Sequence, residues 1–162
     1  MKKLGFFVVF LSLFMLLSAC SNPVQDEILS YVNDELPAIA KAEEEIIAKY
    51  SNVTGANYTD DATLYDALTN EIIPLYSDFI DKLEAIRISD KELQSIHESY
   101  IEAAKQQHKA LKIMVTALEN QDLTLIEEAN GLLEKSQKEI NVFEVNLQKY
   151  AEENNVEITI LK

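Results

Sequence analysis

Residues 91–120 read KELQSIHESYIEAAKQQHKALKIMVTALEN, and one helical face is marked by positions that alternate steps of three and four residues without a slip. That face comprises Leu93, Ile96, Tyr100, Ala103, Gln107, Ala110, Met114 and Ala117. Alternating steps of three and four average 3.5 residues. Such a repeat predicts a long helix that packs nearly parallel to its neighbours with left-handed crossing, as in coiled coils and four-helix bundles.

The same repeat continues downstream, from Asp122 to about Glu153. Its positions are Ile126, Ala129, Leu133, Ser136, Ile140, Phe143, Leu147 and Tyr150. Gln121 and Asp122 leave room only for a tight turn between the two periodic segments. The sequence therefore predicts an antiparallel helical hairpin from residue 91 to about residue 153.

Two further periodic segments precede the hairpin, from about Val24 to Tyr50 and from about Ala62 to Ile88, separated by a polar loop. The apolar positions are Leu29, Val32, Leu36, Ile39, Ile46 and Tyr50 in the first, and Tyr65, Leu68, Ile72, Leu75, Phe79, Leu83 and Ile86 in the second. Each segment contains a proline. At Pro37 we expect either a kink or a new helix that starts near Asn33 or Asp34, and Pro74 should free the carbonyl of Asn70 and bend its helix.

The composition agrees with an all-α fold. The chain has 3 glycines, 3 prolines and no tryptophan, which disfavours a fold of strands and tight turns. We predict an antiparallel four-helix bundle of long helices with left-handed, coiled-coil-like packing over residues 26–155, followed by a tail at residues 156–162 that docks on the bundle or frays.

The N-terminus has the three parts of an export signal. Lys2 and Lys3 precede an uncharged run from Leu4 to Leu17, which is shorter than the roughly 20 residues that span a bilayer. The run ends in Leu17-Ser18-Ala19-Cys20. This ending resembles the lipobox of bacterial lipoproteins. The resemblance covers residues 1–20 and implies that residues 1–19 are removed and that Cys20 carries a diacylglyceryl thioether, a palmitate-type anchor.

The mature chain is short-tethered and acidic. Removal of residues 1–19 leaves 12 basic and 28 acidic residues, a net charge of −16, which argues against nucleic-acid binding and against lying flat on anionic lipid. Cys20 and the tether up to Gln25 place the domain close to the bilayer, because the five residues from Ser21 to Gln25 reach about 17 Å at most. The richness in Lys, Ile, Asn and Glu is typical of a low-GC Gram-positive organism, which would place the protein at the outer face of the cytoplasmic membrane. Ser21 would permit outer-membrane sorting in a Gram-negative envelope, and both alternatives stay open.

The sequence shows no motif for catalysis, and we predict no catalytic residue, no metal site and no cofactor beyond the lipid. His97 and His108 lie 11 residues apart on one helix. That separation is about 16 Å, too far to share one ion, so we expect both imidazoles on a flank near solvent.

A polar layer in the middle of the bundle is the one candidate site. Glu43 falls at a core-facing position of the first helix, and Gln107 and Ser136 interrupt the stripes of the last two helices at a similar height. Tyr76 and Tyr100 could complete a site for a small ligand or ion. The alternatives are a layer that sets helix register, or a Glu43 that leans out to water.

Two classes of function follow. The first is a non-enzymatic protein-interaction module of the cell envelope, of which an inhibitor or immunity-like protein is one form. The second is a lipoprotein that binds a metal or small ligand around Glu43. An exposed apolar groove would favour the first class, and a closed pocket around Glu43 would favour the second.

Overall fold

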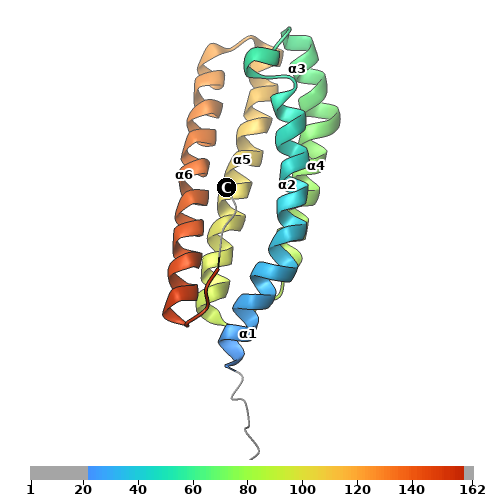
Figure 1. The fold of residues 1–162 in the computed structure, drawn as a ribbon. Helices are drawn as coiled ribbons and strands as arrows, with labels where there is room; N and C mark the ends of the chain where they lie inside the picture. Colours follow the sequence, from blue (N-terminus) through green and yellow to red (C-terminus); the bar gives the residue numbers. More distant parts are fainter. Residues whose placement is uncertain (1–21, 159–162) are drawn as a thin grey trace, which may run out of the picture.

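The computed structural model describes residues 22–158, and within this range the protein is all-α, with four helical segments packed against one another and no strand (Figure 1). The predicted fold class is therefore confirmed. The segments are α1–η1–α2 (Pro23–Ser30, Tyr31–Glu35, Leu36–Ser51), α3–η3–α4 (Asp61–Ala67, Leu68–Ile72, Ile73–Ala85), α5 (Lys91–Asn120) and α6 (Leu123–Glu153), with a short 3₁₀ turn η2 (Gly55–Asn57) between the first two. The export signal, Cys20 and residues 159–162 lie outside the described residues.

Each helical segment begins at a side chain that caps its free backbone N–H groups. Asn22 caps α1 and places Pro23 in the first turn, so residues 23–25 of the expected tether are helical. Asp90 accepts hydrogen bonds from the backbone N–H groups of Glu92 (3.1 Å) and Leu93 (2.9 Å) at the start of α5. Asp122 caps α6 in the same way, after a left-handed residue, Gln121 (φ 53°), has ended α5. The tight turn predicted between α5 and α6 is thus confirmed.

Pro37 and Pro74, the two prolines inside the long helical segments, each lie just after a π-helical turn, and the helical backbone is not broken there. In η1 the Leu36 N–H donates to the Tyr31 carbonyl, five residues back, and in η3 the Ile73 N–H donates to the Leu68 carbonyl. A proline has no N–H for the usual bond and its ring crowds the preceding turn. One widened turn accommodates the ring while the helix continues. Of the two outcomes expected at Pro37, a new helix start is therefore wrong.

Small side chains at heptad spacing hold α5 and α6 together along their length. On α5 these are Ala103, Ala110 and Ala117, and on α6 they are Ala129 and Ser136, all fully buried. Side chains of this size let two helix backbones approach closely, and α5 and α6 have the most extensive contact of any helix pair in the described structure. The hairpin is therefore the most tightly packed part of the bundle.

The other two helical segments pack on this hairpin one after the other, and one side of the bundle has almost no close helix–helix contact. α4 packs on α5 and α2 packs on α4, whereas α2 and α6 have almost no close backbone approach within residues 22–158. Figure 1 shows α2 and α6 facing one another across the front of the bundle, with α5 visible between them. We call this open side the seam.

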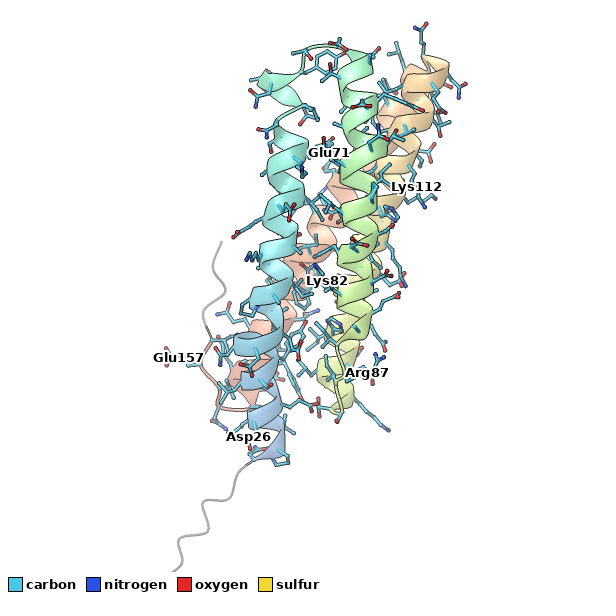
Figure 2. The ribbon with its side chains drawn as sticks, turned by 90° about the vertical axis from the view of Figure 1, so that its right-hand side faces the viewer. Asp26, Glu71, Lys82, Arg87, Lys112 and Glu157 are labelled. Carbon is cyan, nitrogen blue, oxygen red and sulfur yellow. The ribbon has the colours of Figure 1, made fainter. Side chains whose placement is uncertain are left out.

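Hydrogen bonds close the lower end of the seam, where α1 lies (Figure 1). The Gln25 side-chain amide donates to the Asn154 carbonyl (2.6 Å), and the Glu27 carboxylate accepts from the backbone N–H groups of Ser89 (2.5 Å) and Asp90 (2.9 Å). Past α6 the chain turns back and buries Val156. Glu157 points away from the bundle (Figure 2). These contacts tie α1 to both the α4–α5 connection and the C-terminal turn.

The core follows the predicted stripes closely in the last two helices and less well in the first. Leu29, expected inside, is 42% exposed, and the neighbouring Ile28 is fully buried in its place. The π-helical turn shifts the rotation of the helix, which brings Ile28 and Tyr31 inward. Among the described helices none is both long and apolar enough to cross a bilayer.

The tight hairpin contact gives a first prediction. Replacing Ala110 with leucine should destabilise the protein by about 1–3 kcal/mol, because the added carbons have no space between the two backbones. Ala38→Leu, on the exposed side of α2, is the matched control and should stay within about 0.5 kcal/mol of the wild type. Urea unfolding of the two variants measures both values. Equal effects would contradict the close approach of α5 and α6.

Candidate functional site in the groove between α2 and α6

The seam contains two cavities that lie one above the other along the bundle, and together we call them the groove. The lower cavity has a volume of about 620 Å³ and the upper one a volume of about 230 Å³. The lower is lined by Val32, Leu36, Pro37, Ile39, Ala40, Lys41, Glu43, Glu44, Tyr100, Phe143, Glu144 and Leu147, and the upper by Ile46, Ile47, Tyr50, Ile72, Tyr76, Gln107, Leu111, Leu133 and Gln137. Most of these side chains are apolar, and many of them, such as Ile39, Phe143 and Leu111, are at most 5% exposed. Val32, Leu36, Tyr50 and Leu133 are half-buried, and Pro37, Ala40 and Ile47 are the apolar lining residues most open to solvent.

Glu43 is the charged group at the middle of this surface. It is half-buried, and the Tyr100 hydroxyl donates a hydrogen bond to its Oε2 atom at 3.0 Å. Burial raises the pKa of the Glu43 carboxyl, the hydrogen bond from Tyr100 lowers it, and the charge of Glu144 raises it further. In the described residues neither carboxylate has a basic side chain within 4.0 Å. The carboxylates of Glu43 and Glu144 therefore have no ion-pair partner among the described residues, although Lys41 also lines the groove.

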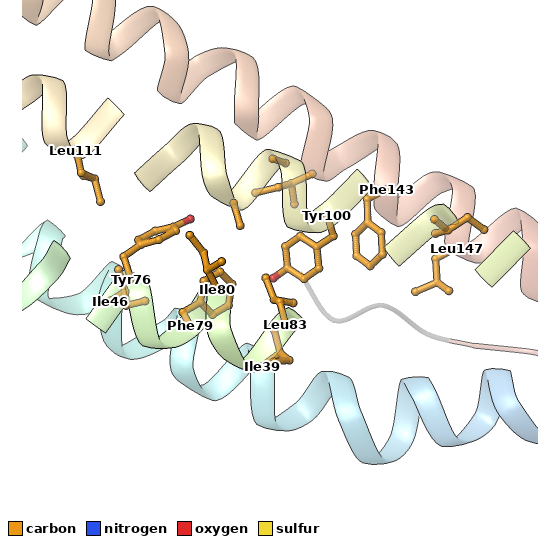
Figure 3. Close-up of a cluster of buried hydrophobic side chains, with 14 of the residues drawn as sticks. Ile39, Ile46, Tyr76, Phe79, Ile80, Leu83, Tyr100, Leu111, Phe143 and Leu147 are labelled. Carbon is orange, nitrogen blue, oxygen red and sulfur yellow. The ribbon is translucent and has the colours of Figure 1, made fainter. Parts of the chain in front are cut away.

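Two phenols connect this carboxylate to the core. Tyr100 stacks on Phe143 of α6, with ring centroids 4.6 Å apart and planes 15° apart (Figure 3). The Tyr76 hydroxyl donates to Oε1 of Gln107. Burial raises the pKa of Tyr76 and of Tyr100, and the charge of Glu43 adds to both shifts. Both phenols therefore stay protonated at neutral pH and act as hydrogen-bond donors.

The structure thus brings together four of the five residues of the expected polar layer, as the pairs Glu43–Tyr100 and Tyr76–Gln107. Ser136 is placed differently. Its hydroxyl donates to the Leu133 carbonyl (2.9 Å) within α6, and its side chain is fully buried. Ser136 serves as a small residue of the α5–α6 contact.

His97 is a buried polar residue that the sequence did not reveal. It is only 3% exposed, so the expectation that it lies near solvent is wrong. Its Nε2 atom lies 2.9 Å from the Leu83 carbonyl, which requires a proton on Nε2, and its Nδ1 atom accepts from the Tyr31 hydroxyl at 2.9 Å. Tyr31 is not among the apolar positions predicted for this segment, because a regular α-helical repeat does not include the π-helical turn of η1. His97 therefore joins η1, α4 and α5.

His108 lies apart from His97, half-buried on the same helix. Its ring is parallel to that of Tyr76, with centroids 5.8 Å apart and planes 5° apart. Its Nε2 atom is 3.4 Å from the Ser77 hydroxyl. These contacts place His108 on the α4 side of α5, and it is not among the residues that line the groove.

The buried imidazole gives a prediction for pH. Burial lowers the pKa of His97, so its neutral form is the stable one in the folded protein. The free energy of unfolding should therefore be fully retained above about pH 6.5, the pKa of an unfolded histidine, and fall below it by up to about 1.4 kcal/mol per pH unit. Burial and the charge of Lys112 also lower the pKa of His108, which is less deeply buried. His97→Gln should therefore remove most of the fall between pH 6.5 and 5, and His108→Gln a smaller part of it. Urea unfolding at several pH values tests this, and a flat wild-type profile would contradict it.

The half-buried carboxylate gives a prediction of opposite sign. Its raised pKa means that ionised Glu43 costs the folded protein free energy, and this cost appears as pH rises above about 4.5. Glu43→Gln should therefore raise the urea concentration at the unfolding midpoint at pH 7, and this increase in stability should become smaller as the pH falls. Glu128→Gln removes the same charge from an exposed position of α6. If the two variants gain equally, the effect is one of net charge and not of burial.

Comparison with known proteins adds the identity of the family. The model of the EMYY-motif containing lipoprotein family matches residues 1–157, which include the export segment, Cys20 and the whole bundle. The string Glu-Met-Tyr-Tyr itself does not occur in residues 1–162. No curated protein and no solved structure matches the chain. The match over nearly the whole chain agrees with the lipobox at Leu17–Cys20, and the chain therefore belongs to the EMYY-motif containing lipoproteins, which makes it a lipid-anchored, membrane-associated protein.

Proposed function

We propose that this lipoprotein is a non-enzymatic protein-interaction module, held by its lipid at the outer face of the cytoplasmic membrane. The observation that carries the proposal is the open apolar groove along the seam. A large apolar surface on a soluble domain costs free energy in water, and surfaces of this kind are typical of binding sites.

The shape of the groove favours a protein segment over a small molecule. A pocket for a small ligand encloses most of the ligand surface. Here the groove is open along its length and extends from Val32 to Tyr50 on α2. Its titrating groups also do not favour catalysis, because buried Tyr76 and Tyr100 keep their protons and supply no nucleophile.

The position of the groove suits a partner in the envelope. α1 begins at Pro23, so the chain from Cys20 to the first helical residue spans at most about 11 Å. The groove begins near Val32, about 14 Å further along the helix. A partner at the membrane surface can reach it there. The net charge of −16 would attract a basic partner and speed its encounter.

Photo-cross-linking in cells tests the proposal. A photoreactive amino acid at Leu36, in the groove, should yield one discrete cross-linked protein, whereas the same group at Asp81, exposed on α4, should not. Cys20→Ala should remove the product, because the domain leaves the membrane. The cross-linked protein is identified by mass spectrometry and then purified for direct binding.

Two exposed alanines of α2 supply the matched variants for that binding assay. Ala40 lines the groove and Ala38 does not. Ala40→Trp should weaken binding of the purified partner at least tenfold, and Ala38→Trp should leave it unchanged. Equal affinity for the two variants, or equal cross-linking from Leu36 and Asp81, would contradict the proposal.

A further inference from the structure

The face that η1 and α2 present toward the seam carries a helix-pairing repeat in which Ile39 and Ile46 are buried and the other positions are half-buried. Its positions are Val32, Leu36, Ile39, Glu43, Ile46 and Tyr50, which alternate steps of four and three residues. Such a repeat is typical of a helix that packs against other helices over its whole length. Here α2 packs on α4, while α6, on the other side, stays apart. The seam is therefore shaped for one more helix.

The dimensions of the seam set the length of that helix. From Val32 to Tyr50 the groove extends for about 27 Å, which corresponds to about 18 residues of helix. Residues 159–162, which follow the described chain, span about 14 Å at most when extended, which is about half of the groove. A second copy of this domain would bring another charge of −16 to an acidic surface. A helix of another protein can be long enough to fill the groove and need not be acidic.

The charges of the seam set the chemistry of that helix. Glu43 lies near the middle of the groove, and Tyr100 holds its carboxylate by a hydrogen bond (3.0 Å). Glu44 and Glu144 also line the groove, and exposed Lys41 is the one basic residue among the lining groups, so the surface is negative. A purely apolar helix would remove the water around the Glu43 carboxylate and would offer no hydrogen bond or opposite charge in its place. A lysine or arginine at that point would pair with the carboxylate instead.

We propose that the seam receives an amphipathic helix of a partner protein that presents a single lysine or arginine in the middle of its apolar face. This inference rests on the proposed function and names the chemistry of the partner. The apolar side chains of the helix fill the groove on either side of Glu43, and the basic side chain pairs with Glu43. Because Glu43 is near the midpoint, the pairing is possible in either direction of the helix.

Designed peptides test this chemistry without knowledge of the partner. The probe is an 18-residue helix with leucines at three- and four-residue spacing, an uncharged glutamine-rich outer face and one central lysine among the leucines. A matched probe has leucine in place of the lysine. Binding is measured by fluorescence anisotropy to the full lipidated protein in nanodiscs of zwitterionic lipid, with empty nanodiscs as the blank.

The expected result is a coupling between the lysine and Glu43. Glu43→Gln should weaken binding of the lysine probe at least fivefold and leave the leucine probe equal or tighter, because an amide is easier to bury than a carboxylate. Ala40→Trp should weaken both probes, and Ala38→Trp neither. Circular dichroism of each variant confirms that the helical content is retained and that the melting temperature is no lower than that of the wild type.

Three outcomes would overturn the inference. If Glu43→Gln affects both probes equally, the basic residue is not recognised. If Ala40→Trp affects neither, the seam does not hold a helix. If the protein without probe is dimeric and Ala40→Trp makes it monomeric, the occupant is a second copy. In each case a partner cross-linked from Leu36 in cells would leave the interaction function standing, so the two proposals fail separately.

Discussion

The close contact between α5 and α6 determines the arrangement of the other helices. Ala103, Ala110 and Ala117 on one helix and Ala129 and Ser136 on the other leave no side-chain layer between the two backbones. α6 is thereby held against α5. α2 packs on α4 and η3, reaches α5 through the hydrogen bond between Glu43 and Tyr100, and has almost no close backbone approach to α6 within the described residues. The seam therefore lies on the side of the bundle where two helices have almost no close backbone contact.

Polar groups inside the bundle form hydrogen bonds that connect neighbouring helices. His97 joins η1 to α4 through Tyr31 and the Leu83 carbonyl, and both of its ring nitrogens are satisfied. A buried imidazole with two hydrogen bonds fixes the position of each neighbour, because breaking either bond leaves a polar atom unpaired. Glu43 differs, since it bonds to Tyr100 on the inner side and faces the seam on the other. The Glu43 carboxylate thus lies at the boundary between the core and the groove.

Much of the fold could be predicted from the sequence, and the reasons for the failures are local. α5 and α6 lie within a residue of their expected bounds, because an uninterrupted repeat and two aspartate caps leave little freedom. Pro37 and Pro74 suggested interruptions, but a π-helical turn keeps each helix continuous and changes which residues face inward, as Ile28 and Leu29 show. Of the candidate site, four residues do lie in hydrogen-bonded pairs. The open seam could not be predicted, because periodicity shows which face is apolar and not which neighbour covers it.

The reactivity of a single introduced cysteine tests the open seam most directly. The resemblance to a lipobox implies that the lipid is attached to the thiol of Cys20, the one cysteine in residues 1–162, so Leu36→Cys in the purified lipoprotein would carry the one free thiol. If the seam is open, a maleimide should modify this thiol at a rate within about tenfold of that at exposed Ala38→Cys and far faster than at buried Ala110→Cys. Protection of Leu36→Cys to the level of Ala110→Cys would show that α6 covers α2, and would contradict the account of the groove.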